Sequence, residues 1–421
     1  MNVIEKPQSG VASDAYAMPE LQENFAAEVD LASRWLGGSV LAASDESFGD
    51  KESLLTTTPA AFEPGHYGPR GEIVDGWETK RRREPGHDWA LIRLGTPGVI
   101  TAVDVDTSFF TGNFPTTCMI EACGVEGYPS PKELQSVDTE WIEIVSRSPL
   151  KGDTHNRFEV SEKHRFTHIR LSVFPDGGIA RLRIFGQVVP DPRLFDGLTI
   201  DLASQDHGGQ VVASSDGFYT SAAMLNRPDK ACTMGEGWET RRRRDDGNDH
   251  VMIRLALPGT LRLVEIDTAH FKYNASAEVA LFGVNYLSPD SAEWTPLLSR
   301  RRLQPDTRHI FPVPAGTSKF SFVRLDAFPD GGISRVRLWG DIDPARRESG
   351  YLWFNLLPHR QATNLLLENG VPVELMARLI DARPMAENTI TRLIRDATSH
   401  TAAAALTALK AMLEGTTHLP R

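Results

Sequence analysis

The sequence predicts an all-β protein with two tandem β-sandwich repeats of jelly-roll type, followed by a small helical appendage at the C-terminus. Three observations lead to this fold class. A set of landmarks occurs twice in the same order, and short runs alternate between apolar and polar residues. The last part of the chain changes to the spacing of apolar residues that is typical of helices.

The first observation is an internal duplication. GWETKRRR and GWETRRRR begin 161 residues apart, at Gly76 and Gly237. FPDGGI recurs 154 residues apart, at Phe174 and Phe328, so the second copy has lost residues in a loop but keeps the order of landmarks. A unit of about 150 residues has a usual domain size. The duplication predicts the same strand order in both copies.

The second observation is the alternating pattern within each copy. Residues 99–106 and 168–173 alternate between two sets of side chains with a period of two. Short runs of this kind, separated by Gly, Pro, Asn and Asp, indicate half-buried antiparallel strands. Helical periodicity is almost absent between about residue 85 and residue 345. Several such strands in each unit favour a sandwich or jelly roll.

The third observation concerns the C-terminal segment. From Trp353 onward the apolar residues follow helical spacing, and TAAAALTALKAMLEG predicts a capped helix that stops at Gly415. This segment suits either a docking element or a plain helical cap. The predicted organisation is an N-terminal extension over residues 1–29, repeats over 30–188 and 198–343, a linker over 189–197, and a helical segment over 350–421.

Composition and charge exclude several classes of protein. The 421 residues, 40% hydrophobic and 24% charged, fit a globular protein. A formal net charge of −11 disfavours binding to nucleic acid or to an anionic membrane. The sequence has no apolar run near the ~20 residues of a membrane span and no apolar secretory core at its start. We expect a cytoplasmic protein, and the sequence leaves a homo-oligomer open.

Cysteine and histidine spacing gives no metal motif. Cys118, Cys123 and Cys232 form an odd, sparse set without CxxC, and we interpret all three as small core residues. No HxH or HExxH string occurs. No cofactor is firmly implied, and a divalent metal held by distant loops is left open.

A run of four basic residues follows Trp-Glu-Thr in each copy. A lone basic run is usually a solvated face that pairs with nearby acids. Its recurrence inside WETxRRR favours a binding site instead, because the planar fork of arginine suits a carboxylate or ureido oxygen. On a strand alternate side chains face opposite ways, so only Arg81 and Arg83, or Lys80 and Arg82, can share a site.

Two loop motifs complete the candidate site. FPDGGI predicts a turn in which Pro presets φ and the Gly pair supplies positive φ. Its aspartates, Asp176 and Asp330, either cap the turn or place a carboxylate at the sandwich rim. The loops that end at Asn113 and Asn274 follow a strand and can bind a polar ligand, although either loop alone is better explained as an ordinary turn.

Together these landmarks resemble the allantoicase family over residues 30–343. The resemblance rests on DESFGDKESLL from Asp45, GEIVDGWETKRRR from Gly71, DTSFFTGN from Asp106, FPDGGIARLRIFG from Phe174, and the second-copy strings GWETRRRR and FPDGGISRVRLWG. It implies two jelly-roll, galactose-binding-like modules in one chain. It also implies hydrolysis of allantoate to ureidoglycolate and urea in purine degradation for nitrogen use, at a C–N bond of a linear amidine. FKYNAS replaces FTGNFP in the second copy, which implies two unequal pockets.

The chemistry of allantoate suggests roles within these motifs. Allantoate bears a carboxylate on a carbon with two ureido groups, and urea release needs a base for water and a proton for the leaving nitrogen. Arginine can hold the carboxylate, and a Glu or Asp of raised pKa can donate the proton. The candidates for proton transfer are Glu78, Asp176, Glu239 and Asp330. The candidates for substrate binding are Arg81, Arg83, Asn113, Arg242, Arg244 and Asn274.

The alternative interpretation comes from another class of function. A jelly roll often serves as a binding module, so the chain could be a non-catalytic carbohydrate- or small-ligand-binding protein. That interpretation predicts exposed aromatic side chains on one face and no turnover. Nucleic-acid binding through the arginine runs conflicts with the acidic net charge and would show a steep dependence on salt.

Overall fold

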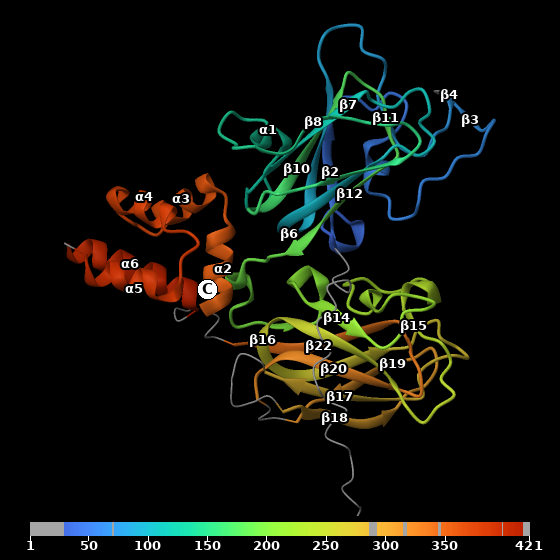
Figure 1. The fold of residues 1–421 in the computed structure, drawn as a ribbon, viewed down its shortest axis with the longest axis vertical. Helices are drawn as coiled ribbons and strands as arrows, with labels where there is room; N and C mark the ends of the chain where they lie inside the picture. The colour runs from blue at the N-terminus through green and yellow to red at the C-terminus, as the bar shows by residue number, and fades with distance from the viewer. Residues whose placement is uncertain are drawn as a thin grey trace, which may run out of the picture.

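The computed structural model describes residues 29–69, 71–285, 293–314, 318–343, 347–397 and 399–415. Figure 1 shows two β-sandwiches, one above the other, with a helical domain beside them. The predicted fold class is therefore confirmed. Residues 1–28, nearly all of the predicted N-terminal extension, lie outside the described residues.

Repeat 1 forms the upper sandwich. Its strand order is β1-β12-β6-β10-β7-β8, and both β2 and β9 also pair with β6. A two-stranded sheet of β5 and β11 lies apart from this path. The elements are β1 (Val29–Asp30), β2 (Ser39–Ala43), β3 (Tyr67–Gly68), β4 (Gly71–Glu72), β5 (Trp77–Glu78), β6 (Asp88–Asp106), β7 (Thr117–Cys123), α1 (Pro131–Leu134), β8 (Ile142–Pro149), β9 (His155–Glu159), β10 (Arg165–Phe174), β11 (Gly178–Ile179) and β12 (Arg181–Val188).

Repeat 2 forms the lower sandwich with the same topology. Its order is β13-β22-β16-β20-β17-β18, with β14 and β19 on β16 and a separate pair of β15 and β21. The identical order confirms the duplication. The strands are β13 (Thr199–Asp201), β14 (Gln210–Ser214), β15 (Trp238–Glu239), β16 (Asp249–Asp267), β17 (Glu278–Val284), β18 (Thr295–Arg302), β19 (Arg308–Pro312), β20 (Phe320–Phe328), β21 (Gly332–Ile333) and β22 (Arg335–Ile342).

One long strand joins the two layers of each sandwich. The first half of β6 pairs with β2 and β10, and its second half pairs with β9 and β12. The segment GTPG, from Gly95 to Gly98, lies between the halves. A Cβ at Gly98 would lie 2.2 Å from the carbonyl oxygen of Gln187, so glycine lets the neighbouring strand approach closely there.

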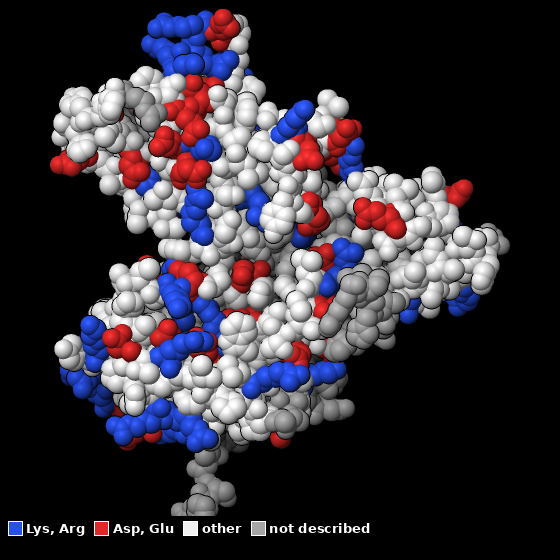
Figure 2. All heavy atoms as spheres, turned by 180° about the vertical axis from the view of Figure 1, so that it is seen from behind, with Lys and Arg blue, Asp and Glu red and all other residues white. Residues whose placement is uncertain are grey.

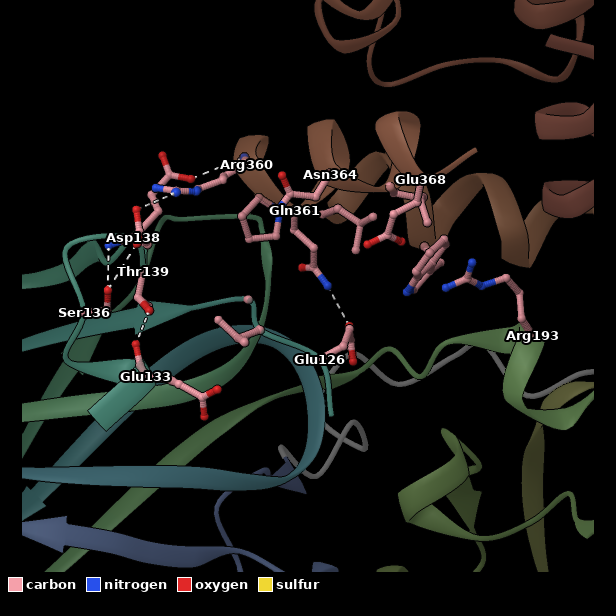
Figure 3. A pocket seen from close by; sticks show the side chains of 17 residues that line it. Glu126, Glu133, Ser136, Asp138, Thr139, Arg193, Arg360, Gln361, Asn364 and Glu368 are labelled. Carbon is pink, nitrogen blue, oxygen red and sulfur yellow. Dashed lines mark hydrogen bonds and ion pairs between the residues drawn. The ribbon is translucent and has the colours of Figure 1, made fainter. Parts of the chain in front are cut away.

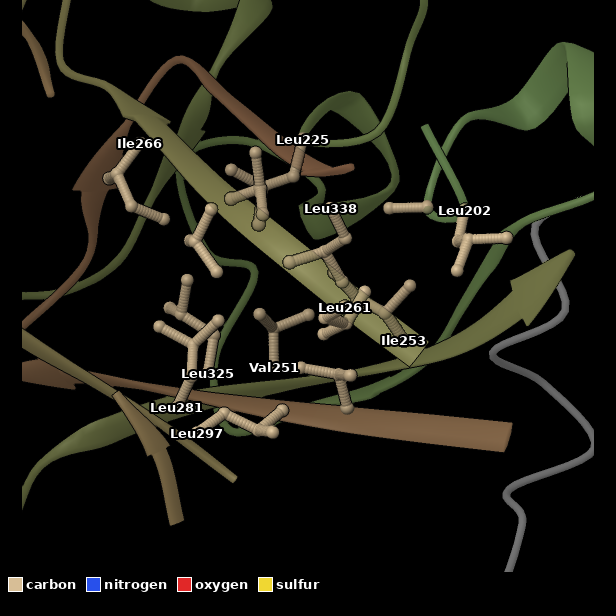
Figure 4. Close-up of a cluster of buried hydrophobic side chains, with 14 of the residues drawn as sticks. Leu202, Leu225, Val251, Ile253, Leu261, Ile266, Leu281, Leu297, Leu325 and Leu338 are labelled. Atoms are coloured by element: carbon tan, nitrogen blue, oxygen red, sulfur yellow. The ribbon is translucent and has the colours of Figure 1, made fainter. Parts of the chain in front are cut away.

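Each sandwich encloses its own apolar core. The core of repeat 2 gathers leucine, valine and isoleucine side chains between the layers (Figure 4), and Trp238 is fully buried in it. Trp77 is fully buried in the equivalent core of repeat 1. Cys118 and Cys123 are buried as predicted, whereas Cys232 is exposed, so its interpretation as a core residue was wrong. Cys232 lies on the irregular segment before β15, outside the alternating strands.

The C-terminal segment forms a compact helical domain with a separate core. The Ala-rich segment is a helix as predicted, with Ser399 as its N-cap and Gly415 at a φ of 70° as its C-cap. The domain contacts repeat 1 through Gln361, whose Nε2 donates to Glu126 Oε1 at 2.7 Å. Its helices are α2 (Arg347–Leu356), α3 (His359–Glu368), α4 (Val373–Asp381), α5 (Glu387–Arg395) and α6 (His400–Glu414). Among the described residues, no helix is long and apolar enough to cross a membrane.

Removal of the helical domain tests whether the sandwiches depend on it. A variant that ends at Asp343 should keep both sandwiches folded, because the helical core shares no residue with either sandwich core. We expect circular dichroism to lose helical signal while the β signal and its thermal transition persist. Loss of the β transition in the purified variant would show instead that the helical domain is part of the sandwich fold.

Candidate active site

Three segments of repeat 1 meet at one end of its sandwich. We call residues 76–83, 106–113 and 174–178 rim 1. Glu78 pairs with Gly178 in the β5–β11 sheet, and the Gly178 amide donates to the Asn113 carbonyl at 2.8 Å. Asn113 Nδ2 then donates to Glu78 Oε1 at 2.7 Å. Rim 1 therefore brings together candidate residues that are far apart in the sequence.

Repeat 2 builds the same arrangement at residues 237–244, 267–274 and 328–332, which we call rim 2. Glu239 pairs with Gly332 in the β15–β21 sheet. Asn274 Nδ2 donates to Glu239 Oε1 at 2.6 Å. The hydrogen bond between a glutamate and an asparagine is thus a property of the repeat unit.

The fixed Trp-Glu-Thr lead-in has a structural cause. The indole Nε1 of the buried Trp77 donates to the carbonyl of Asp45 at 2.8 Å. Thr79 is buried beside the FPDGG turn, where its Oγ1 accepts from the Gly177 amide at 3.1 Å. These two residues anchor the segment on either side of Glu78, so the glutamate stays at the rim.

The basic run of rim 1 divides into paired and unpaired side chains. The strand expected here ends at Glu78, because the segment beyond it forms no ladder. Arg82 Nη1 nevertheless pairs with Asp88 Oδ1 at 2.8 Å, and Lys80 Nζ lies 3.2 Å from Asp45 Oδ2. Arg81 and Arg83 are exposed and form no ion pair within the described part of the chain.

Rim 2 repeats this division. Arg243 Nη1 pairs with Asp249 Oδ1 at 2.9 Å, while Arg242 and Arg244 are exposed and lack an ion pair among the residues described. Figure 2 shows basic side chains grouped at the outer end of the upper repeat. The two arginines that we nominated in each copy are therefore available to a ligand.

The aspartate of the FPDGG turn holds the basic run in place. Asp176 Oδ2 accepts from the Arg82 amide at 2.8 Å, and Asp330 Oδ2 accepts from the Arg243 amide at 3.0 Å. Both aspartates are half-buried. The structure thus gives each one a positioning contact across two loops. Their predicted part in proton transfer stays a prediction.

In the FPDGG turns, glycine is needed more for the space that a Cβ would take than for a positive φ. Gly177 has a φ of 137°, but Gly178 and the second-copy pair do not lie in the positive-φ region. A Cβ at Gly178 would lie 1.9 Å from the Phe110 ring. The expectation that both glycines supply positive φ was therefore wrong, because the second one is needed for space.

Burial and hydrogen bonding act in opposite directions on Glu78. Desolvation by burial raises the pKa of its carboxyl, and the hydrogen bond from Asn113 lowers the pKa in part. A half-buried carboxyl with a raised pKa suits proton transfer near neutral pH. Within the described residues, no cluster of three His, Cys, Asp or Glu side chains is arranged to hold a metal ion.

Sequence reasoning missed two buried arginines that support the rims. Arg181 is 2% exposed and binds both carboxylate oxygens of Asp75, one residue before Gly76. Arg335 binds Asp229 Oδ1 at 2.9 Å and the Glu236 carbonyl at 2.5 Å, next to the second GWET string. The recurrence of RxRx(F/W)G at the end of both copies was the signal that could have identified them.

A second missed group lies around Phe174. The Arg147 guanidinium carbon lies 4.1 Å from the centre of the Phe174 ring, and the His87 ring lies 4.7 Å from it. In repeat 2, Arg300 lies 4.0 Å above Phe328 in the same way. Burial, followed by the positive charge of Arg82, lowers the pKa of His87. Ser146-Arg147 and Ser299-Arg300 recur at matching places in the two copies, but this recurrence does not by itself place Arg147 beside Phe174.

A cavity of about 600 Å³ lies elsewhere, between repeat 1 and the helical domain. Figure 3 shows Glu126 of repeat 1 facing Gln361 of α3, and Asp138 of repeat 1 beside Arg360 of the same helix. The charged side chains that line this cavity are mainly acidic, which disfavours binding of a substrate that carries a carboxylate. Rim 1 and rim 2 therefore remain the better candidates for the active site.

Comparison with known proteins points to one family. The family model described as the allantoicase repeat matches residues 29–189 and 200–343, which are the two sandwiches. A probable allantoicase of Nocardia farcinica is 48% identical over 314 residues, covering 74% of this chain and 94% of that protein. A probable allantoicase of Streptomyces coelicolor is 46% identical over 329 residues, covering 76% and 86%.

Solved structures agree with these relatives. The crystal structure of an allantoicase from Saccharomyces cerevisiae is 32% identical and has a TM-score of 0.63. The match covers 76% of this chain and 95% of the yeast chain. The family match ends at residue 343, so the helical domain lies outside it.

Proposed function

The chain belongs to the allantoicase family and is a hydrolase that splits allantoate into ureidoglycolate and urea, and we propose that the rim of the repeat unit is its active site. One observation carries this proposal. A half-buried glutamate is hydrogen-bonded to an asparagine beside arginines that lack an ion pair among the described residues, in both copies. Such a rim offers a proton-transfer group and anion-binding groups on one surface.

Arg81 and Arg83 are proposed to bind the substrate carboxylate. Both side chains are exposed and, among the described residues, neither is neutralised by an acid. A guanidinium can donate two parallel hydrogen bonds to a carboxylate, which fixes the orientation of the substrate as well as its position. Asn113 would add an amide that can bind a ureido oxygen or nitrogen. The equivalent groups of rim 2 are Arg242, Arg244 and Asn274.

Glu78 is proposed to move the proton. Its ionised carboxylate accepts a hydrogen bond from Asn113, so it can also accept a proton from water. The water oxygen then bonds to the central carbon as the bond from that carbon to one ureido nitrogen breaks. Glu78 returns the proton to the leaving nitrogen, which gives urea and ureidoglycolate with no atom or charge left over. Glu239 is the counterpart in rim 2.

Asp176 is the alternative group for proton transfer. Only its Oδ2 accepts a hydrogen bond among the described residues, so the other oxygen can face a ligand. The contact of Asp176 with the Arg82 amide better supports a positioning role, and the same holds for Asp330 in rim 2. We also propose a cytoplasmic location, which the three free cysteines support because thiols stay reduced there.

The direct test is urea release from allantoate. The purified protein should release urea from allantoate and not from allantoin or arginine, because the rim combines carboxylate-binding arginines with a proton-transfer group. A colorimetric urea assay, run with and without divalent metal, measures this. A folded protein that binds allantoate without releasing urea would favour the alternative of a non-catalytic binding module.

Substitution of Arg81 by lysine tests the carboxylate contact. Lysine keeps the charge but loses the two-pronged geometry, and a charge-assisted hydrogen bond contributes about 1.5–3 kcal/mol. Arg81→Lys should therefore lower kcat/KM roughly ten- to a hundredfold. Arg82→Lys is the matched control, because a lysine can still pair with Asp88. Equal, small effects at both positions would show that Arg81 lies on a solvated face.

The pH profile tests the role of Glu78. Asn113→Ala removes the hydrogen bond that lowers the pKa of Glu78, so that pKa should rise further. A base must be ionised, so activity is present above this pKa and is lost as the pH falls through it. The acid limb of kcat/KM should therefore move to higher pH in the variant. Gly112→Ala, whose added Cβ would meet nothing within 4 Å, should leave the limb in place. An unmoved limb in Asn113→Ala would remove Glu78 from the proton transfer.

A further inference from the structure

The two rims differ in charge at an arginine that the proposed mechanism does not use. Arg147 and Arg300 occupy the same position, each above the first residue of the FPDGG turn, at 4.1 Å from Phe174 and 4.0 Å from Phe328. Thr117, the first residue of β7, is the register partner of Phe174. Glu278, the first residue of β17, is the register partner of Phe328. The two arginines therefore differ mainly in the neighbour that the sheet supplies.

That neighbour decides whether a carboxylate compensates the positive charge of each arginine. Arg147 Nε donates to the hydroxyl of Thr117 at 2.9 Å, and Arg147 has no ion pair among the described residues. Arg300 Nε and Nη2 each lie 2.6 Å from Glu278 Oε2. No carboxylate compensates the guanidinium of Arg147 among the described residues, whereas that of Arg300 is already bound to the Glu278 carboxylate.

The basic runs show the same trend. Among the described ion pairs, Arg82 of rim 1 pairs with Asp88 alone. The equivalent Arg243 of rim 2 pairs with Asp249 and also takes both carboxylate oxygens of Asp245, each at 3.0 Å. Glu84 is the equivalent of Asp245 but forms no ion pair with Arg82 among the described residues, and the position that follows carries Pro85 in rim 1 and Asp246 in rim 2. Rim 2 therefore holds more acid around the same basic scaffold.

A third difference concerns His87, which contacts the Phe174 ring in addition to Arg147. The His87 ring packs against this ring in rim 1, with the two ring planes tilted by 35°. The equivalent residue of rim 2 is Asn248, whose amide donates to the Asp249 carbonyl at 2.9 Å. Rim 1 therefore has an imidazole where rim 2 has an amide that is already engaged.

From these differences we infer that rim 1 is the working site for the anionic substrate and that Arg147 is a further substrate-binding residue there. The inference rests on the proposed function, because it assumes a carboxylate substrate. Arg147 would add a further guanidinium to the arginines of the basic run that bind the substrate carboxylate. Phe174 and Gly178 are four residues apart, so their Cα atoms are at most ~14 Å apart even in an extended chain. This limit keeps Arg147, which lies above Phe174, on the same rim as Glu78, the partner of Gly178.

In rim 2 the equivalent position, Arg300, disfavours binding of an anionic substrate. The Glu278 carboxylate occupies the donors of Arg300 and repels a second anion. The mutual contact of Asn274 and Glu239 is intact, so rim 2 keeps the loop geometry. It lacks a free guanidinium above its phenylalanine, and we expect it to contribute little turnover.

The test moves the acid from one rim to the other. Thr117→Glu should give Arg147 the ion pair that Arg300 has, and the fold already tolerates this pair in repeat 2. Urea release from allantoate should then show kcat/KM lowered roughly ten- to a hundredfold, mainly through KM. Thr117→Gln has the same size without the charge and should keep most of the activity. Glu278→Thr removes the acid from rim 2 and should not lower activity.

The outcomes separate the inference from the proposed function. An active wild-type protein whose Thr117→Glu variant loses at most half of its activity would overturn the inference, because rim 2 would then be turning over as well. An equal loss in Thr117→Gln would also overturn it, since the effect would not come from charge. A folded wild-type protein that releases no urea would overturn the proposed function itself. Unchanged thermal unfolding of each variant shows that any loss of activity is local.

Discussion

The geometry of each rim depends on the close approach of two loops, which only glycine permits. A Cβ at Gly178 would lie 1.9 Å from the Phe110 ring, and a Cβ at Gly332 would lie 1.9 Å from the Asn274 carbonyl oxygen. Because this space is free, the asparagine loop lies directly on the FPDGG turn, and the Gly178 amide donates to the Asn113 carbonyl. Asn113 can then reach Glu78, which is paired with Gly178 of the turn in the β5–β11 sheet. The candidate proton-transfer group is thus placed by packing of the backbone.

Buried arginines fix the segments that lead into the rims. Arg181 is almost fully buried, and its guanidinium is satisfied by Asp75 and by main-chain carbonyls, including that of Thr58. Removal of Asp75 would be costly, because it would leave the buried guanidinium of Arg181 without its carboxylate partner. Arg181 thus fixes the path of the chain at Thr58 and at Asp75. The GWET segment begins immediately after this path, which gives the rim a rigid base.

The features that follow from the internal duplication could be predicted from the sequence. The contacts that depend on how particular strands pair could not. The duplication predicted the shared strand order, and the alternation of the basic run placed Arg81 and Arg82 in different surroundings although the strand ends at Glu78. The contact between Arg147 and Thr117 could not be predicted, because it follows from how β7 pairs with β8. Exposure of Cys232 was also missed, since an irregular segment has no periodicity to interpret.

The comparison of the two copies separates scaffold from chemistry within one chain. Both copies keep the buried tryptophan, the turn aspartate bound to a backbone amide, and the glutamate bound to an asparagine. The Glu78–Asn113 pair has a counterpart in rim 2, so this pair by itself does not decide which of the two rims turns over. What differs is the charge around this scaffold, where Glu278 and Asp245 neutralise arginines whose counterparts in rim 1 lack these partners. Since an anionic substrate responds to that charge over several ångströms, electrostatics can make one of two nearly identical scaffolds the catalytic one.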